Sequence, residues 1–79
     1  MTTNQALAHR IQALLKEKQM TQYRLGMNSG VPHQTITNIL KNAVTDNMFS
    51  TVIQIANGFD MTLVQFLNDP IFIKLAEEI

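Results

Sequence analysis

The sequence contains no cysteine and no tryptophan. Without cysteine there is no disulfide framework and no thiolate metal site, and two histidines alone are too few ligands for zinc. No apolar run approaches the roughly 18 residues that a membrane-spanning helix needs, and the first residues lack the pattern of a signal peptide. We therefore expect a soluble, cytoplasmic protein that needs no metal and no cofactor.

Groups that could carry out catalysis are equally scarce. His9 and His33 fall on different predicted helices, and no pair of carboxylates stands at a useful helical spacing from either one. Glu77 and Glu78 are adjacent near the end of the sequence, where solvation is their simplest role. The sequence therefore favours a binding protein over an enzyme.

Charge is balanced over the whole chain but not along it. The formal net charge is zero, yet residues 1–44 carry a net +4 and residues 45–79 a net −4. This asymmetry indicates a charged partner on the positive side, and it is equally compatible with a dipolar surface that serves only solubility. The positive half contains Arg10, Lys16, Lys18, Arg24 and Lys41 against Glu17, and the negative half contains Lys74 against Asp46, Asp60, Asp69, Glu77 and Glu78.

Apolar residues recur at helical spacing along the whole sequence, and no stretch alternates with the period of a strand. A chain of this length corresponds to one domain, 1–79, so we expect a single all-α domain of five or six helices. The first helix is predicted over about residues 4–18, with Thr2, Thr3 or Asn4 as its cap. Its apolar stripe consists of Leu7, Ile11, Leu14 and Leu15.

Two short helices are predicted on either side of Gly30. The first begins after Thr21, whose hydroxyl can cap it, and ends at Gly30, which takes a positive φ without steric cost. The second covers about residues 32–41, because Pro32 has the φ of a helix start. Its predicted inward face is Ile36, Ile39, Leu40 and Ala43, and its outward face is His33, Gln34, Thr37, Asn38 and Lys41.

Three further helices are predicted after a polar connection over residues 42–47. The second of them begins at Thr62, which can form a capping box with Gln65, and the last covers residues 70–79. The apolar residues of the first are Phe49, Val52, Ile53, Ala56 and Phe59. In the last helix Ile71, Phe72, Leu75, Ala76 and Ile79 share one broad face, and Ile73 lies opposite.

The helices on either side of Gly30 have the spacing of a helix-turn-helix, from Gln22 to Lys41. In such a motif apolar residues lock the helices together while the second helix presents a polar face to the DNA major groove. The key positions read Gln22, Leu25, Gly26, Gly30, Val31, Ile36 and Ile39. With these residues the chain resembles the lambda-repressor-like (Cro/XRE) helix-turn-helix family, and the resemblance extends over roughly residues 7–67.

Four residues depart from the family pattern. Gly26 replaces the commoner Ala, and Pro32 stands where a Ser or Thr cap is usual, so the second helix of the motif lacks a side-chain cap. Asp60 replaces a Gly, and Asp tolerates left-handed geometry better than most residues. Leu40 stands where a charged residue is frequent. None of these changes breaks the fold.

The resemblance implies roles for the outward-facing residues. The family's base-reading positions correspond to His33, Gln34, Thr37 and Asn38. Its phosphate-binding positions correspond to Gln22, Thr35, Lys41 and Asn42. Each residue alone has the simpler role of a solvated side chain, but a solvated helix face usually carries Glu and Lys rather than amides. Because Gln and Asn pair bidentately with adenine, and the face has no Arg, we expect half-sites that contain A·T pairs.

The apolar C-terminal helix leaves two functions open. Its candidate contact residues for a two-fold dimer are Ile71, Phe72, Ile73, Leu75 and Ile79, although the helix can also simply close the core. The main hypothesis is a homodimeric, sequence-specific repressor of phage or plasmid type that binds double-stranded DNA through residues 32–42. The alternative is a protein-interaction module of the same fold, similar to an antitoxin or anti-repressor, with little DNA binding of its own.

Overall fold

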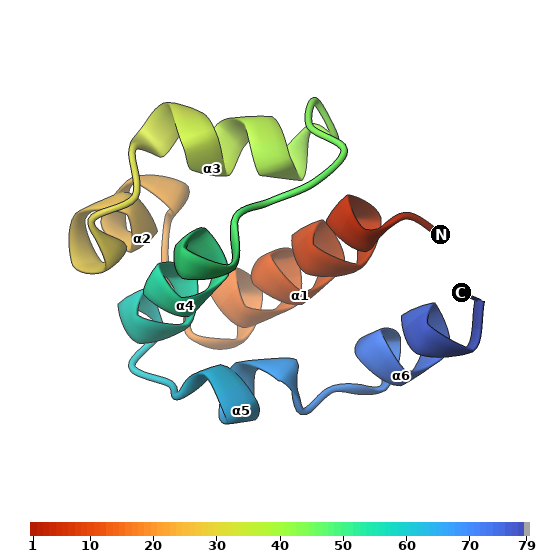
Figure 1. Ribbon diagram of the computed structural model, residues 1–79. Helices are drawn as coiled ribbons and strands as arrows, with labels where there is room; N and C mark the ends of the chain where they lie inside the picture. The colour runs from red at the N-terminus through yellow and green to blue at the C-terminus, as the bar shows by residue number, and fades with distance from the viewer. Residues whose placement is uncertain (79) are drawn as a thin grey trace.

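The computed structural model describes residues 1–78, and within them it contains six α-helices and no strand (Figure 1). This confirms the predicted all-α fold. Helices α2 and α3 lie on one side of the molecule, and α5 and α6 lie on the other (Figure 1). No helix in the described part is both long and apolar enough to cross a bilayer. The helices are α1 (Thr3–Glu17), α2 (Gln22–Ser29), α3 (His33–Leu40), α4 (Phe49–Gly58), α5 (Leu63–Leu67) and α6 (Pro70–Glu78).

Helix α1 begins with a capping box at Thr2. The Thr2 hydroxyl accepts a hydrogen bond from Gln5 N at 3.0 Å, and Thr2 N donates to Gln5 Oε1 at 2.7 Å. The box gives partners to amides that have none within the first turn of a helix. Of the three predicted cap residues, Thr2 is therefore the cap, whereas Asn4 is buried inside the fold.

The apolar core lies between α1, the α2–α3 pair, α4 and α5. Phe66 is fully buried in it, and its ring stacks on Phe59 with the centroids 6.4 Å apart. Burying a large apolar side chain of this kind stabilises the fold by about 1.5–3 kcal/mol. The buried apolar cluster consists of Leu7, Ala8, Ile11, Leu14, Leu25, Val31, Ile36, Ile39, Ile55, Ala56, Phe59 and Phe66.

The inward faces of α3 and α4 differ from the faces predicted from the sequence. Ala43 is exposed, because α3 ends at Leu40 and Ala43 already belongs to the loop, so its predicted inward position is wrong. In α4, Phe49 and Ile53 are exposed while Ile55 is fully buried. The face of α4 that packs on the core is Val52, Ile55, Ala56 and Phe59, at helical spacing.

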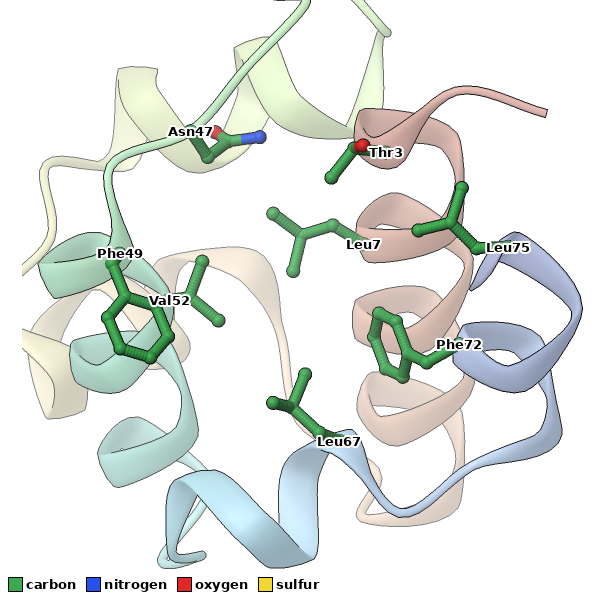
Figure 2. A pocket seen from close by; sticks show the side chains of 8 residues that line it. All are labelled: Thr3, Leu7, Asn47, Phe49, Val52, Leu67, Phe72 and Leu75. Carbon is green, nitrogen blue, oxygen red and sulfur yellow. The ribbon is translucent and has the colours of Figure 1, made fainter. Parts of the chain in front are cut away.

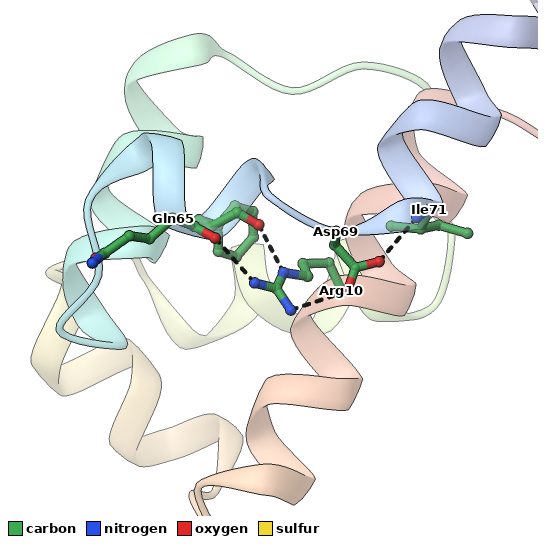
Figure 3. A network of polar contacts seen from close by, with 5 residues as sticks. Arg10, Gln65, Asp69 and Ile71 are labelled. Atoms are coloured by element: carbon green, nitrogen blue, oxygen red, sulfur yellow. Dashed lines mark hydrogen bonds and ion pairs between the residues drawn. The ribbon is translucent and has the colours of Figure 1, made fainter.

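Arg10 of α1 holds α5 and α6 in place (Figure 3). Its side chain is only 12% exposed, and it donates from Nε to Phe66 O at 2.7 Å and from Nη2 to Gln65 O at 3.2 Å. Its Nη1 lies 3.2 Å from Asp69 Oδ2, and Asp69 Oδ1 accepts from Ile71 N at 2.9 Å. No residue of α6 is fully buried in the described range, so this polar clamp and the packing of Phe72 against the core together attach the helix.

Candidate nucleic-acid interface

The turn between α2 and α3 is built at Gly30. At the start of α2, the Thr21 hydroxyl accepts a hydrogen bond from Arg24 N at 3.1 Å. At its end, Gly30 has φ 75° and donates from its amide to Gly26 O at 3.0 Å. Glycine adopts this left-handed conformation without strain, so the chain can change direction sharply before α3. Both the predicted cap and the predicted turn residue are confirmed.

Two glycines allow the helices around the turn to approach closely. A Cβ on Gly26 would lie 3.3 Å from Val31 O, so α2 packs directly against the turn. A Cβ on Gly58 of α4 would lie 2.7 Å from Ser29 Cβ and 2.9 Å from Leu25 Cδ1, closer than real side chains come. The approach at Gly26 agrees with the sequence pattern, whereas nothing in the sequence marks Gly58. Together they fix α2 between the turn and α4.

Helix α3 presents polar residues outward and locks its apolar residues inward. Ile36 and Ile39 are fully buried, and no side chain caps the helix at Pro32. The four residues predicted to read bases stand at positions one, two, five and six of α3, which places them on one side of the helix. We call these residues the reading face: His33, Gln34, Thr37 and Asn38.

Hydrogen bonds order the reading face and join it to α2. Gln34 Nε2 donates to Asn38 Oδ1 at 2.9 Å, one helical turn away. Thr37 Oγ1 donates to Gln22 Oε1 at 3.4 Å. Gln22, the first residue of α2 and a predicted phosphate ligand, therefore lies beside the predicted base readers. The structure brings these four polar side chains into one continuous surface.

Tyr23, which the sequence pattern did not mark, extends this surface. Its side chain is 65% exposed, and its ring meets the His33 imidazole edge-on, with centroids 6.3 Å apart and planes at 62°. Tyr23 also borders a recess with Met27 and Pro32. The signal in the sequence is an aromatic residue directly after Gln22, near the start of the first helix of the motif.

Three other residues were predicted to bind phosphates. Thr35 is half-buried in the first turn of α3, and Lys41 is exposed at its C-cap. Asn42 follows with φ 57°, and its Oδ1 accepts a hydrogen bond from Asn4 Nδ2 at 2.8 Å. Asn42 is thus exposed at the end of α3 and at the same time held by α1.

The structure reduces the positive charge that α1 can offer to a partner. Arg10 is turned inward and paired with Asp69, so its charge is neutralised within the fold. Among residues 1–78, Arg24 and Lys41 make no ion pair, and both are exposed. These two cations lie within or directly beside the helix-turn-helix and are free to meet an anion.

An apolar groove opens between α1, α4, α5 and α6 (Figure 2). Its volume is about 230 Å³, and Phe72 and Leu75 point into it from α6. Both belong to the predicted dimer contact, of which Ile71 is half-buried and Ile73 is 65% exposed; Ile79 lies outside the described residues. The groove is lined by Thr3, Leu7, Asn47, Phe49, Val52, Leu67, Phe72 and Leu75.

Comparison with known protein families gives a match over most of the chain. The model of a family described as Cro/C1-type HTH DNA-binding domain matches residues 10–70, which is well over half of the chain. The matched residues include the last two turns of α1 and all of α2 to α5. No curated protein and no solved structure matches the chain.

Proposed function

The chain belongs to the Cro/C1-type helix-turn-helix DNA-binding family, and we propose that it binds a specific duplex sequence as a homodimer and represses transcription from that site. The reading face is the observation that carries the proposal. It carries two amides and no Asp, Glu, Lys or Arg, and it forms one surface with Gln22 of α2. A helix face that is only solvated usually carries Glu and Lys. Amide side chains carry no charge, but they match the donor and acceptor pattern of base edges in the major groove.

Gln34 and Asn38 are the residues that we assign to base reading. Each amide can donate to adenine N7 and accept from adenine N6, and the Thr37 methyl group can pack against a thymine methyl group. Gln34 and Asn38 bond to each other in the free protein, so binding replaces this bond by bonds to the bases. The proposed operator therefore has A·T pairs opposite this turn of α3.

Gln22 and Lys41 are assigned to the flanking phosphates. Gln22 is the first residue of α2, where the free amides of the first turn and the helix dipole favour a phosphate group. Lys41 is exposed at the opposite end of α3 and supplies positive charge there. Contacts of this kind set the register of the protein on the duplex without reading its sequence.

We infer that the apolar groove binds a second copy of the chain. Dimers of helix-turn-helix proteins read half-sites about 34 Å apart, one turn of DNA. The longest of the three principal extents of one chain (33 × 24 × 22 Å) is similar to this spacing. The groove is lined in part by Asn47, at the end of the loop that follows α3, and by Phe49, the first residue of α4, and no charged residue lines it. An apolar surface without charged residues suits a self-complementary two-fold contact.

Repression needs no further activity under this proposal. A dimer that occupies an operator overlapping a promoter excludes the polymerase by its presence alone. We assign the protein to regulators of phage or plasmid type, acting on DNA in the cytoplasm.

One observation favours a second function. Exposed apolar side chains gather on α4, α5 and the residue before α4: Met48, Phe49, Ile53, Val64 and Leu67. A protein-interaction module of the same fold would use such a surface for a different protein.

A salt titration separates the two functions. For DNA binding, the logarithm of the binding constant falls linearly with the logarithm of salt concentration, with a slope of about −0.9 for each phosphate neutralised. We expect a duplex to be bound at low salt and released steeply as salt rises. If no duplex is bound at low salt while a protein partner is retained, the interaction module is the correct function.

A further inference from the structure

Asn4 is the only polar residue among residues 1–78 that is buried, with 1% of its surface exposed. It lies in the first turn of α1, before the residues that match the family model. A buried amide is strongly destabilising unless its hydrogen bonds are satisfied. Its partners therefore show what it does in the fold.

All three partners belong to the end of α3 or to the loop that follows it. Asn4 Nδ2 donates to Ile39 O at 2.9 Å and to Asn42 Oδ1 at 2.8 Å. Asn4 Oδ1 accepts from Asn47 Nδ2 at 2.9 Å. One side chain of α1 thus ties the last turn of α3 to both ends of the loop over residues 42–47.

The backbone carbonyl of Ile39 fixes the polarity of this chain of amides. A carbonyl oxygen can only accept, so Asn4 must present Nδ2 to it. The second hydrogen of the same Nδ2 is donated to Asn42, which must therefore present Oδ1 as the acceptor. Asn42 is exposed, and its own Nδ2 has no partner among residues 1–78, so a hydrogen-bond donor is left facing outward at the end of α3.

Phosphate oxygens only accept hydrogen bonds, so the outward-facing Nδ2 of Asn42 is a suitable donor for them. We propose that Asn4 is a positioning residue for DNA binding, which orients the Asn42 amide so that its Nδ2 donates to a phosphate beside α3. The inference rests on the proposed function and deepens it. It assigns a role to a residue of α1 that does not touch DNA. In this role the buried Asn4 sets the orientation of Asn42, which contacts the phosphate.

A double-mutant cycle of Asn4→Ala and Asn42→Gly tests the inference on an operator duplex, which is first recovered by selection from a pool of random duplexes. Glycine suits φ 57°, so Asn42→Gly removes the side chain without backbone strain. We expect each single variant to lose about tenfold in operator affinity, the effect of one hydrogen bond to a charged group. The double variant should be no weaker than either single one, since both changes remove the same contact. Base preference and the salt slope should stay unchanged, because the lost contact is neutral and reads no base.

Thr2→Ala is the matched control for a loss of stability at the start of α1. It removes the cap of α1 but none of the contacts to α3. At a temperature where all variants are folded, it should keep the operator affinity of the unchanged protein. The inference is overturned if Asn4→Ala behaves like Thr2→Ala in the binding assay, or if the two losses in the double variant multiply.

Amide hydrogen exchange of the free protein distinguishes this failure from a failure of the proposed function. Asn4→Ala should speed exchange at residues 41–47 more than Thr2→Ala does at equal overall stability. If the unchanged protein binds no duplex, the proposed function is wrong and the DNA-positioning role falls with it. If it binds DNA but exchange at 41–47 does not respond to Asn4→Ala, only the role of Asn4 is wrong.

Discussion

Thr37 of α3 donates a hydrogen bond to Gln22 of α2 across 3.4 Å. The two residues are 15 positions apart, and the turn at Gly30 is what brings them together. A duplex that meets the middle of α3 therefore meets the first turn of α2 as well. Base reading and phosphate binding are assigned to neighbouring side chains of one surface.

Replacing both Gln34 and Asn38 by Ala should abolish the base preference. Each bidentate pair with adenine discriminates against a wrong base by about 1–3 kcal/mol, whereas non-specific binding depends on phosphate contacts. Competition between operator and random duplex measures the preference. Gln54→Ala, which removes an exposed amide from α4, is the control and should leave it intact. An unchanged preference in the double variant would remove both residues as readers.

Lys41→Gln should weaken binding to all duplexes alike. Removing one cation that neutralises a phosphate lowers the magnitude of the salt slope by about 1. Fluorescence anisotropy over a series of salt concentrations gives the slope. Lys74→Gln on the exposed surface of α6 removes the same charge away from α3 and should not change it. Equal slopes for the two variants would contradict the phosphate contact of Lys41.

Arg10→Met should destabilise the protein without weakening the DNA affinity of its folded form. The change leaves Asp69 and two carbonyl oxygens without their donor, which we expect to lower the free energy of unfolding by about 1–3 kcal/mol. Urea denaturation measures the loss. Lys16→Met changes an exposed cation of the same helix and should have little effect. A stability equal to that of the Lys16 variant would show that the clamp contributes nothing.

Phe49→Asp should dissociate the proposed dimer. Phe49 is 64% exposed at the groove, and a buried aromatic residue at the centre of an interface typically contributes 2 kcal/mol or more, a factor of about 30 in the dimer dissociation constant. Analytical ultracentrifugation measures that constant. Val64→Asp introduces the same charge at an exposed apolar residue that does not line the groove. The groove is not the dimer contact if both variants associate equally.

Local signals made the helix-turn-helix predictable from the sequence. Thr21, Gly30 and Thr62 act through hydrogen bonds and backbone angles within a few residues, and each occupies its predicted place. Pro32 likewise starts α3 without a side-chain cap, as its chemistry requires. Both ends of α2 and the start of α3 follow from Thr21, Gly30 and Pro32.

Contacts between distant residues could not be predicted in the same way. Asn4 has the sequence context of a helix cap, yet its partners are 35 to 43 positions away. In the sequence, Arg10 belongs to the positive half of the chain. In the structure its side chain is turned inward, because its partners on α5 and before α6 are 55 to 59 positions away. Apolar Phe49 and Ile55 look alike in sequence, and only the packing of α4 against α2 and α5 decides which one is buried.

Selection from a pool of random duplexes tests the central claim most directly. The account predicts that the protein enriches one site with two-fold symmetry, whose half-sites lie about one helical turn apart and contain A·T pairs at the positions facing α3. Recovery of no preferred sequence at a salt concentration that suppresses non-specific binding would contradict it.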